Sequence, residues 1–177
     1  MAASSQTHTA EHRLVARVFQ AADQSNARRV LLASPYEGDG KSHLARCILR
    51  HSSVVTEEPS EVLALGAVES SQDKKGYLWF DGLALLEGEG ASALAPSIRA
   101  SLDGAIVVVR GMATTRDELA DCAERLQVLG VPLLGGVWNE RDHPPADEVL
   151  SDLKSALRKW PSRRRPGFLN RQTRSSA

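Results

Sequence analysis

The segment of residues 30–44 constrains the fold more than any other part of the chain. It reads Val-Leu-Leu-Ala-Ser-Pro-Tyr-Glu-Gly-Asp-Gly-Lys-Ser-His-Leu, an apolar strand followed by a glycine-containing turn and then a helix-compatible stretch. Backbone N–H groups at the start of a helix face phosphates, and the helix dipole favours their negative charge. Gly38 and Gly40 permit backbone geometries that a Cβ atom would block. This order predicts a phosphate-binding P-loop, in which Lys41 reaches the outer phosphates and the Ser42 hydroxyl coordinates Mg²⁺.

The match to the general P-loop pattern is incomplete. Pro35 stands five residues before Gly40, where the pattern has a glycine. The alternative is a polar loop with a surface lysine, because a Gly-Lys-Ser tripeptide occurs by chance in many proteins. The strand before the loop and the helix after it favour the P-loop. Tyr36, inside the loop, is interpreted either as stacking on a base or as exposed to solvent.

The composition is that of one soluble globular domain. The chain has 177 residues, of which 42% are hydrophobic and 25% are charged, enough for a sizeable core. The formal net charge is zero, so no whole-protein field attracts nucleic acid, and no specific nucleic acid is expected.

Cys47 and Cys122 are predicted to be free buried thiols. The five histidines share no ligand spacing, which predicts no zinc site. Because no apolar run approaches the roughly 20 residues of a membrane span and the N-terminus lacks a signal-peptide apolar region, a cytoplasmic location is predicted.

Strand and helix patterns alternate along the chain. The sequence predicts strands over 29–33, 61–65, 77–81, 105–109 and 131–137, and helices over 10–23, 42–50, 115–129 and 146–160, with a short helix ending near 102. Such alternation predicts an α/β fold with three layers, a mainly parallel sheet of about five strands and helices on both faces. Residues 1–8 are predicted to be a disordered N-terminus, 9–160 a P-loop NTPase-like domain, and 161–177 a basic flexible tail. Ligands of such sheets bind at the carboxyl ends of the strands.

Two further polar residues follow predicted strands. Asp81 comes at the end of an apolar strand, where a carboxylate beside the P-loop strand can hold Mg²⁺. An ordinary turn-capping aspartate is an equal alternative. Asn139 ends the last strand, where its amide could face a purine base or simply form a turn. The predicted catalytic residues are Lys41 and Asp81, the metal ligands Ser42 and Asp81, and the nucleotide-binding residues Gly38, Asp39, Gly40, Lys41, Ser42, His43 and Asn139.

Over residues 10–142 the chain resembles the bacterial tyrosine kinases (BY-kinases), relatives of the MinD and ParA ATPases. The loop Gly-Asp-Gly-Lys-Ser over 38–42 is similar to the Pro-Gly-Glu-Gly-Lys-Ser loop of that family. The better match is the second half, where the segments 103–110, 114–119 and 126–139 have close counterparts. The resemblance implies a cytoplasmic ATPase domain that binds ATP and Mg²⁺ and governs exopolysaccharide or capsule synthesis.

The chain also departs from the family pattern. Gly66 and Val68 stand where the family has the two aspartates of its Walker A′ motif. The segment after them is far shorter than in the family, and the tail lacks the tyrosine cluster of the autokinase members. Because phosphoryl transfer depends on positioned charge, these losses predict a pseudoenzyme that binds ATP-Mg²⁺ weakly or not at all and has weak or absent catalysis.

The resemblance also implies partners. BY-kinases engage the cytoplasmic end of a membrane polysaccharide chain-length-control protein, and they form homo-oligomers through an N-terminal helix that 11–19 resembles. Arg163–Arg165 in the basic tail predict either a solvated terminus or a contact with anionic lipid, which would place the chain peripherally at the inner membrane. Two alternatives remain: a non-catalytic scaffold or regulator of a polysaccharide assembly complex, and a ParA/MinD-like positioning ATPase.

Overall fold

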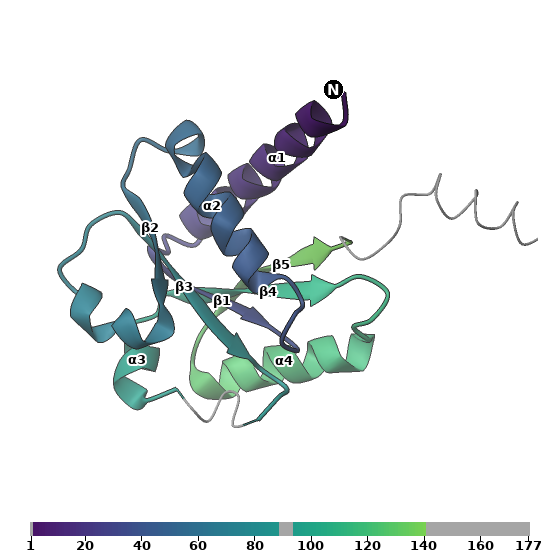
Figure 1. Ribbon diagram of the computed structural model, residues 1–177. Coiled ribbons are helices and arrows are strands. Elements are labelled where there is room, and N and C mark those ends of the chain that lie inside the picture. Colours follow the sequence, from purple (N-terminus) through teal and green to yellow (C-terminus); the bar gives the residue numbers. More distant parts are fainter. Residues whose placement is uncertain (1, 89–93, 141–177) are drawn as a thin grey trace, which may run out of the picture. The chain divides into compact units, whose positions relative to one another are not determined.

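The computed structural model describes residues 2–88 and 94–140, in which strands and helices alternate (Figure 1). The elements are, in order, α1 Ala2–Gln24, β1 Arg29–Ser34, α2 Lys41–Val55, β2 Ser60–Ala64, the 3-10 turns η1 Leu65–Ala67 and η2 Glu69–Ser71, β3 Tyr77–Ala84, α3 Pro96–Ala100, β4 Gly104–Arg110, α4 Arg116–Leu129 and β5 Leu133–Asn139.

The five strands form one sheet in the order β2-β3-β1-β4-β5, and every neighbouring pair is parallel. Helices α1 and α2 cover one face of this sheet, and α3 and α4 cover the other (Figure 1). Parallel sheets of this kind are stable when both faces are buried. The structure therefore confirms the predicted α/β fold with three layers, and it places the P-loop strand β1 at the centre of the sheet.

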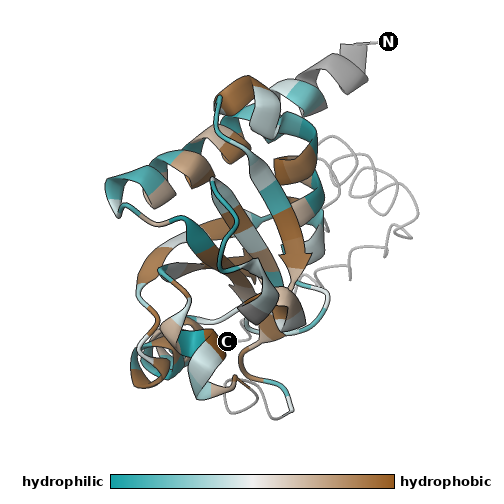
Figure 2. Ribbon diagram, turned by 90° about the vertical axis from the view of Figure 1, so that its left-hand side faces the viewer, coloured by the Kyte–Doolittle hydropathy of each residue, from teal (hydrophilic) through white to brown (hydrophobic). Residues whose placement is uncertain are grey.

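Side chains of β1 divide the core between the two faces. Val30 and Leu32 pack with α1 and α2, whereas Leu31 and Ala33 pack with the residues under α4. This alternation follows from the two-residue period of a strand. In Figure 2 the strands carry hydrophobic, brown stretches between helices that are partly teal. The uninterrupted apolar run of β4 is buried on both faces up to Val109, as its sequence predicts.

An aromatic cluster fills the core beneath α1. The indole of Trp79 on β3 is fully buried. Its ring centroid lies 5.0 Å from that of Phe19 and 6.0 Å from that of Tyr77, and its Nε1 donates a hydrogen bond of 3.1 Å to Ser60 Oγ. Trp79 therefore joins α1, β2 and β3 while its only polar atom is satisfied.

Two predicted strands differ from the structure in burial or extent, and a third, predicted over 131–137, lies two residues later as β5. The segment 61–65 is predicted to be a buried strand, but β2 is the edge of the sheet, and Val62 and Leu63 are only half-buried. The segment 77–81 is predicted to end at Asp81, but β3 continues to Ala84. Asp81 thus lies within a strand, in register with Leu32 of β1 and Ala64 of β2.

The predicted boundaries also differ at the start of the chain. Helix α1 begins at Ala2, so residues 2–8, predicted to be disordered, are helical in the structure. The predicted helix 146–160, the end of the domain at residue 160 and the basic tail 161–177 lie outside the described residues. Within the described ranges, no helix combines the length and apolar character that crossing a membrane requires.

Candidate functional site

The loop between β1 and α2 has the backbone of a tight, glycine-dependent turn. Gly38 and Gly40 have φ angles of 84° and 107°, a left-handed region that glycine adopts without strain. Gly40 immediately precedes α2, and Lys41 is the first residue of that helix. The sequence prediction of a strand, a glycine turn and a helix at this place is confirmed by the geometry.

Asn139 supports this loop from the end of β5. Its Nδ2 donates a hydrogen bond of 2.8 Å to the backbone oxygen of Asp39. A Cβ atom on Gly40 would lie 2.3 Å from the same Nδ2, so the amide packs closely against the loop. The strand order β1-β4-β5 brings the end of β5 to the loop. This bond ties the amide that is predicted to face a purine base to the backbone of the loop.

Asp39 turns inward from the loop. Its side chain is buried, and its Oδ2 accepts a hydrogen bond of 2.9 Å from the backbone N–H of Tyr36. Burial raises the pKa of the Asp39 carboxyl, although the Tyr36 N–H and the nearby Arg110 and Lys41 charges oppose this shift. The Asp39 side chain therefore holds the shape of the loop, and a nucleotide contact at Asp39 stays a prediction.

The carboxylates of Glu37 and Glu87 accept hydrogen bonds from donors of the kind that a P-loop uses to bind phosphate. Lys41 is buried, and its Nζ donates a hydrogen bond of 2.6 Å to Glu37 Oε2. The backbone N–H of Glu37 in turn donates a bond of 2.9 Å to Glu87 Oε2, from the segment after β3. Anionic oxygens thus contact both the lysine ammonium and a loop amide, the two kinds of donor that bind phosphate oxygens.

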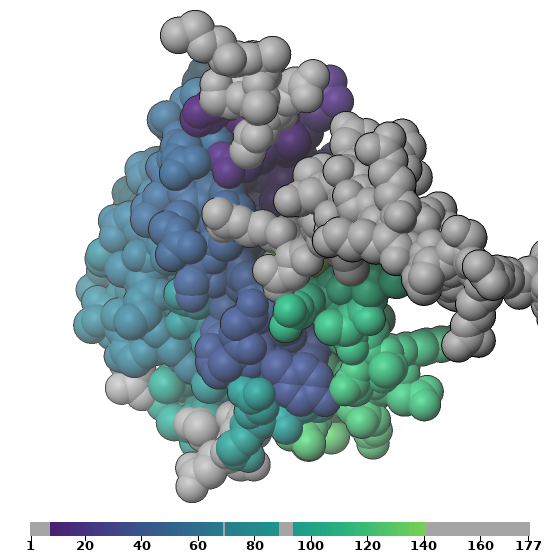
Figure 3. Space-filling model, turned by 45° about the vertical axis from the view of Figure 1, so that its right-hand side comes forward, coloured from purple at the N-terminus to yellow at the C-terminus, as the bar shows by residue number. Residues whose placement is uncertain are grey.

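Tyr36 anchors the loop to the start of α4. Its hydroxyl donates a hydrogen bond of 2.5 Å to Glu118 Oε1, and this bond raises the pKa of Tyr36 to about 12. Glu118 is also the third residue of α4 and completes a capping box with Thr115. Figure 3 shows the indigo loop directly against the green segment that leads into α4. Tyr36 is therefore bound to the protein rather than exposed or free to stack.

Ser42 and Asp81 are the predicted metal ligands. Ser42 is exposed in the first turn of α2. Asp81 lies on β3 opposite Leu32, two residues before the end of the P-loop strand. Its Oδ1 is buried and has no hydrogen-bond partner among the described residues. A buried carboxylate oxygen without a donor suits a cation or a water molecule, so the residues present are compatible with Mg²⁺.

His43 points away from the loop. Its Nε2 lies 4.0 Å from Glu11 Oε1 on α1 and 3.5 Å from Cys47 Sγ on α2. Its backbone N–H donates a bond of 3.0 Å to the Gly40 oxygen. The side chain of His43, one of the predicted nucleotide-binding residues, therefore lies beside Glu11 of α1.

The two residues that the sequence resemblance places at the Walker A′ positions, Gly66 and Val68, are uncharged. Gly66 lies exposed in η1, and Val68 is fully buried in the apolar core beneath the second face of the sheet. Neither position supplies a carboxylate to the loop.

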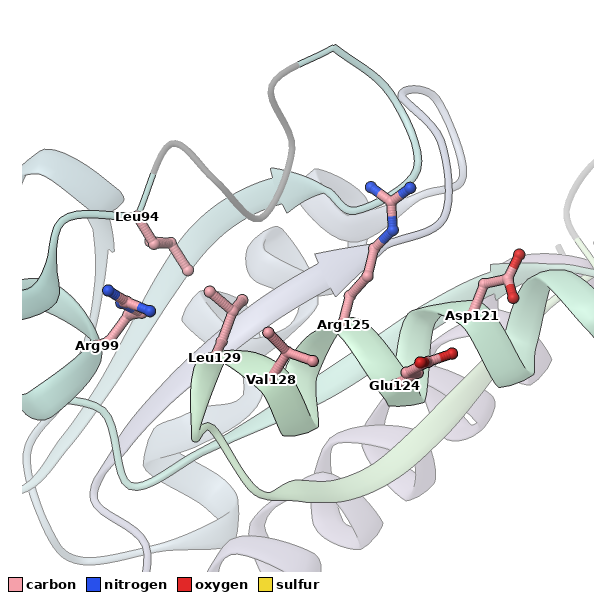
Figure 4. A pocket seen from close by; sticks show the side chains of 7 residues that line it. All are labelled: Leu94, Arg99, Asp121, Glu124, Arg125, Val128 and Leu129. Atoms are coloured by element: carbon pink, nitrogen blue, oxygen red, sulfur yellow. The ribbon is translucent and has the colours of Figure 1, made fainter.

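A hollow lies along α4. It has a volume of about 760 Å³ and combines apolar and charged side chains, namely Leu94, Arg99, Asp121, Glu124, Arg125, Val128 and Leu129 (Figure 4). Arg125 also donates a bond of 2.6 Å to the backbone oxygen of Leu85. None of these lining residues belongs to the P-loop.

A parallel α/β sheet with a glycine turn and a lysine at the start of the following helix defines a P-loop NTPase-like domain. No protein-family model matches the sequence, and no curated protein sequence matches it significantly. Among solved structures, the BceF tyrosine kinase domain is similar, with a TM-score of 0.55 and 18% identity over 75% of this chain and 76% of that one. The kinase domain of Escherichia coli tyrosine kinase ETK aligns with a TM-score of 0.41 and 12% identity over 67% of this chain and 71% of that one. The chain thus has the fold of a bacterial tyrosine kinase domain, as the sequence resemblance predicts.

Proposed function

We propose that this chain binds ATP with Mg²⁺ at its P-loop, turns it over weakly or not at all, and serves exopolysaccharide or capsule biosynthesis. The observation that carries the proposal is the pairing of a retained Lys41 at the start of α2 with uncharged residues at the Walker A′ positions. The fold shared with the BceF kinase domain supports it.

The binding part of the proposal rests on the loop and its two neighbours. Lys41 would exchange Glu37 for the outer phosphates, and the dipole at the start of α2 would favour them. Ser42 and Asp81 would hold Mg²⁺, which supplies charge neutralisation between the phosphates when it is bound. Because Glu37 and Glu87 compete with phosphate for the same donors, binding is expected to be weak.

The catalytic part rests on the missing carboxylates. In phosphoryl transfer a positioned carboxylate orients the nucleophile, and a positioned general base contributes about 10²–10⁴-fold to the rate. Gly66 and Val68 cannot supply that group. Purified protein is therefore expected to hydrolyse ATP and phosphorylate tyrosine no faster than its Lys41→Ala variant, as measured by phosphate release and by phosphotyrosine detection. Turnover well above that of Lys41→Ala would overturn this part of the proposal.

A second candidate is a scaffold that keeps the fold without nucleotide. The internal bonds of the loop favour this candidate. Asn139 already donates to the backbone oxygen of Asp39, and Glu37 already accepts from Lys41.

For both candidate functions we propose a membrane chain-length-control protein as partner, a cytoplasmic location at the inner membrane, and self-association through α1. The basic tail would add contacts to anionic lipid.

A further inference from the structure

Ligand-type side chains gather where α1 meets α2, apart from the P-loop. Helix α2 carries His43, Cys47 and His51 at intervals of four residues, which places them on one face of the helix. Helix α1 packs beside α2 on the same side of the sheet (Figure 1) and contributes Glu11 to this face. Ligand atoms of Glu11, His43 and Cys47 all lie within 4.8 Å of one another.

The distances within this triad are close to those of a metal site. Cys47 Sγ lies 3.5 Å from His43 Nε2, and His43 Nε2 lies 4.0 Å from Glu11 Oε1. Around a tetrahedral zinc ion, ligands at ordinary Zn–S, Zn–N and Zn–O distances stand roughly 3.3–3.7 Å apart. His43 and Cys47 already have this spacing, whereas the Glu11 carboxylate, within 4.8 Å of both ligand atoms, would need to move toward them to complete the geometry.

The neighbours of Glu11 orient its carboxylate. Oε2 accepts a hydrogen bond of 2.9 Å from Arg50 Nη1 and lies 3.3 Å from His51 Nε2, while Oε1 is the oxygen that faces His43. Partners that hold the second oxygen of a ligating carboxylate are a regular part of metal sites. Cys47 is buried and thus fixed in position, whereas His43 and Glu11 remain partly accessible for entry of an ion.

We propose that Glu11, His43 and Cys47 bind one zinc ion that links α1 to α2, with a water molecule as the fourth ligand. Cys47 releases its proton to solvent on binding, because the thiolate is the ligand. A thiolate and an imidazole select zinc or a similar transition metal over Mg²⁺ and Ca²⁺, which prefer oxygen. Sequence spacing alone predicts no zinc site because the ligands come from two helices that only the fold brings together.

A neighbouring triad shares Glu11 and provides the competing arrangement. His8, Glu11 and His51 also have ligand atoms within 4.8 Å of one another. In that arrangement His51 Nε2 lies 3.3 Å from Oε2, which Arg50 also contacts, and the third member, His8, is exposed. We therefore assign the ion to the triad that contains Cys47.

Zinc titration of the tag-free full-length chain under reducing conditions tests the assignment. One equivalent of Zn²⁺ is expected to bind, with Mg²⁺ giving no signal, and Co²⁺ is expected to show a thiolate-to-cobalt charge-transfer band. Cys47→Ser should weaken zinc binding by at least about tenfold. Two matched variants, Cys122→Ser in the opposite layer of the core and His8→Ala, should bind as the unmodified chain does.

Three results would overturn the proposal. They are absence of zinc binding by the unmodified chain, a cobalt complex without a thiolate band, and loss of binding in His8→Ala but not in Cys47→Ser. The cobalt spectrum uses the unmodified chain, so it decides the question even if Cys47→Ser fails to fold.

Discussion

Replacing Trp79 by alanine is expected to lower the free energy of unfolding by about 3–5 kcal/mol, the range typical of a large aromatic lost from a core. The indole is fully buried and contacts Phe19 and Tyr77, so its removal leaves a cavity between α1 and β3. It also leaves Ser60 without the donor that now reaches its Oγ. Urea unfolding, monitored by circular dichroism, measures this loss of stability. A Trp79→Ala variant that is unfolded even without urea would agree with the prediction.

Trp138 provides the matched control for this variant. It is the same residue type on β5, but it is 52% exposed. Because only about half of this side chain is buried, Trp138→Ala is expected to lower the free energy of unfolding by clearly less than Trp79→Ala does. Equal losses in the two variants would contradict the assignment of Trp79 to the centre of the core.

Gly40→Val is expected to destabilise the protein more than Gly38→Val. Both glycines have left-handed φ angles, so a valine at either position carries backbone strain of about 1–3 kcal/mol. At Gly38 a new Cβ would meet nothing within 4 Å, whereas at Gly40 it would lie 2.3 Å from Asn139 Nδ2. Displacing that amide breaks its bond to the Asp39 oxygen, worth about 0.5–1.5 kcal/mol more.

The same pair of variants separates backbone strain from the contact with Asn139. Urea unfolding of both variants, and of each combined with Asn139→Ala, measures the coupling. We expect the excess loss of Gly40→Val to disappear in the Asn139→Ala background. An excess that persists without Asn139 would show that the close packing of Asn139 on the loop has no energetic weight.

The sequence predicts those elements whose signal is local. The apolar run 105–109 predicts an interior strand because only a strand covered on both faces tolerates such a run, and β4 is that strand. The spacing of apolar residues predicts a helix over 115–129, and α4 spans Arg116–Leu129 with Thr115 as its N-cap. Turn chemistry likewise predicts the loop at Gly38 and Gly40.

Features that depend on tertiary neighbours could not be predicted in this way. The apolar side chains of Val62 and Leu63 predict a buried strand. The sheet order instead places this strand, β2, at the edge of the sheet, where it pairs only with β3. Asp81 resembles a strand end because a charge follows an apolar run, yet pairing with Leu32 and Ala64 continues the strand beyond it.

The same limit applies to the candidate site. Lys41, one of the predicted site residues, is the first residue of α2, which is the place of the lysine in a P-loop. The groups that hold the loop come from far along the chain: Glu87 and Glu118 lie 50 and 82 residues from their loop partners, and Asn139 lies 100 residues away. No local pattern connects positions so distant, so the carboxylates on the loop became evident only from the fold.

Calorimetric titration of ATP-Mg²⁺ into the unmodified chain tests the central claim most directly. We predict saturable 1:1 binding that weakens by about 10–100-fold in Lys41→Ala, because a hydrogen bond to a charged group contributes about 1.5–3 kcal/mol. Glu37→Gln, which removes the carboxylate competing for Lys41, should bind more tightly. Lys74→Ala, which removes a surface lysine paired with Glu61, should leave the affinity unchanged. Absence of binding in the unmodified chain and in Glu37→Gln, or binding that Lys41→Ala does not weaken, would contradict the account.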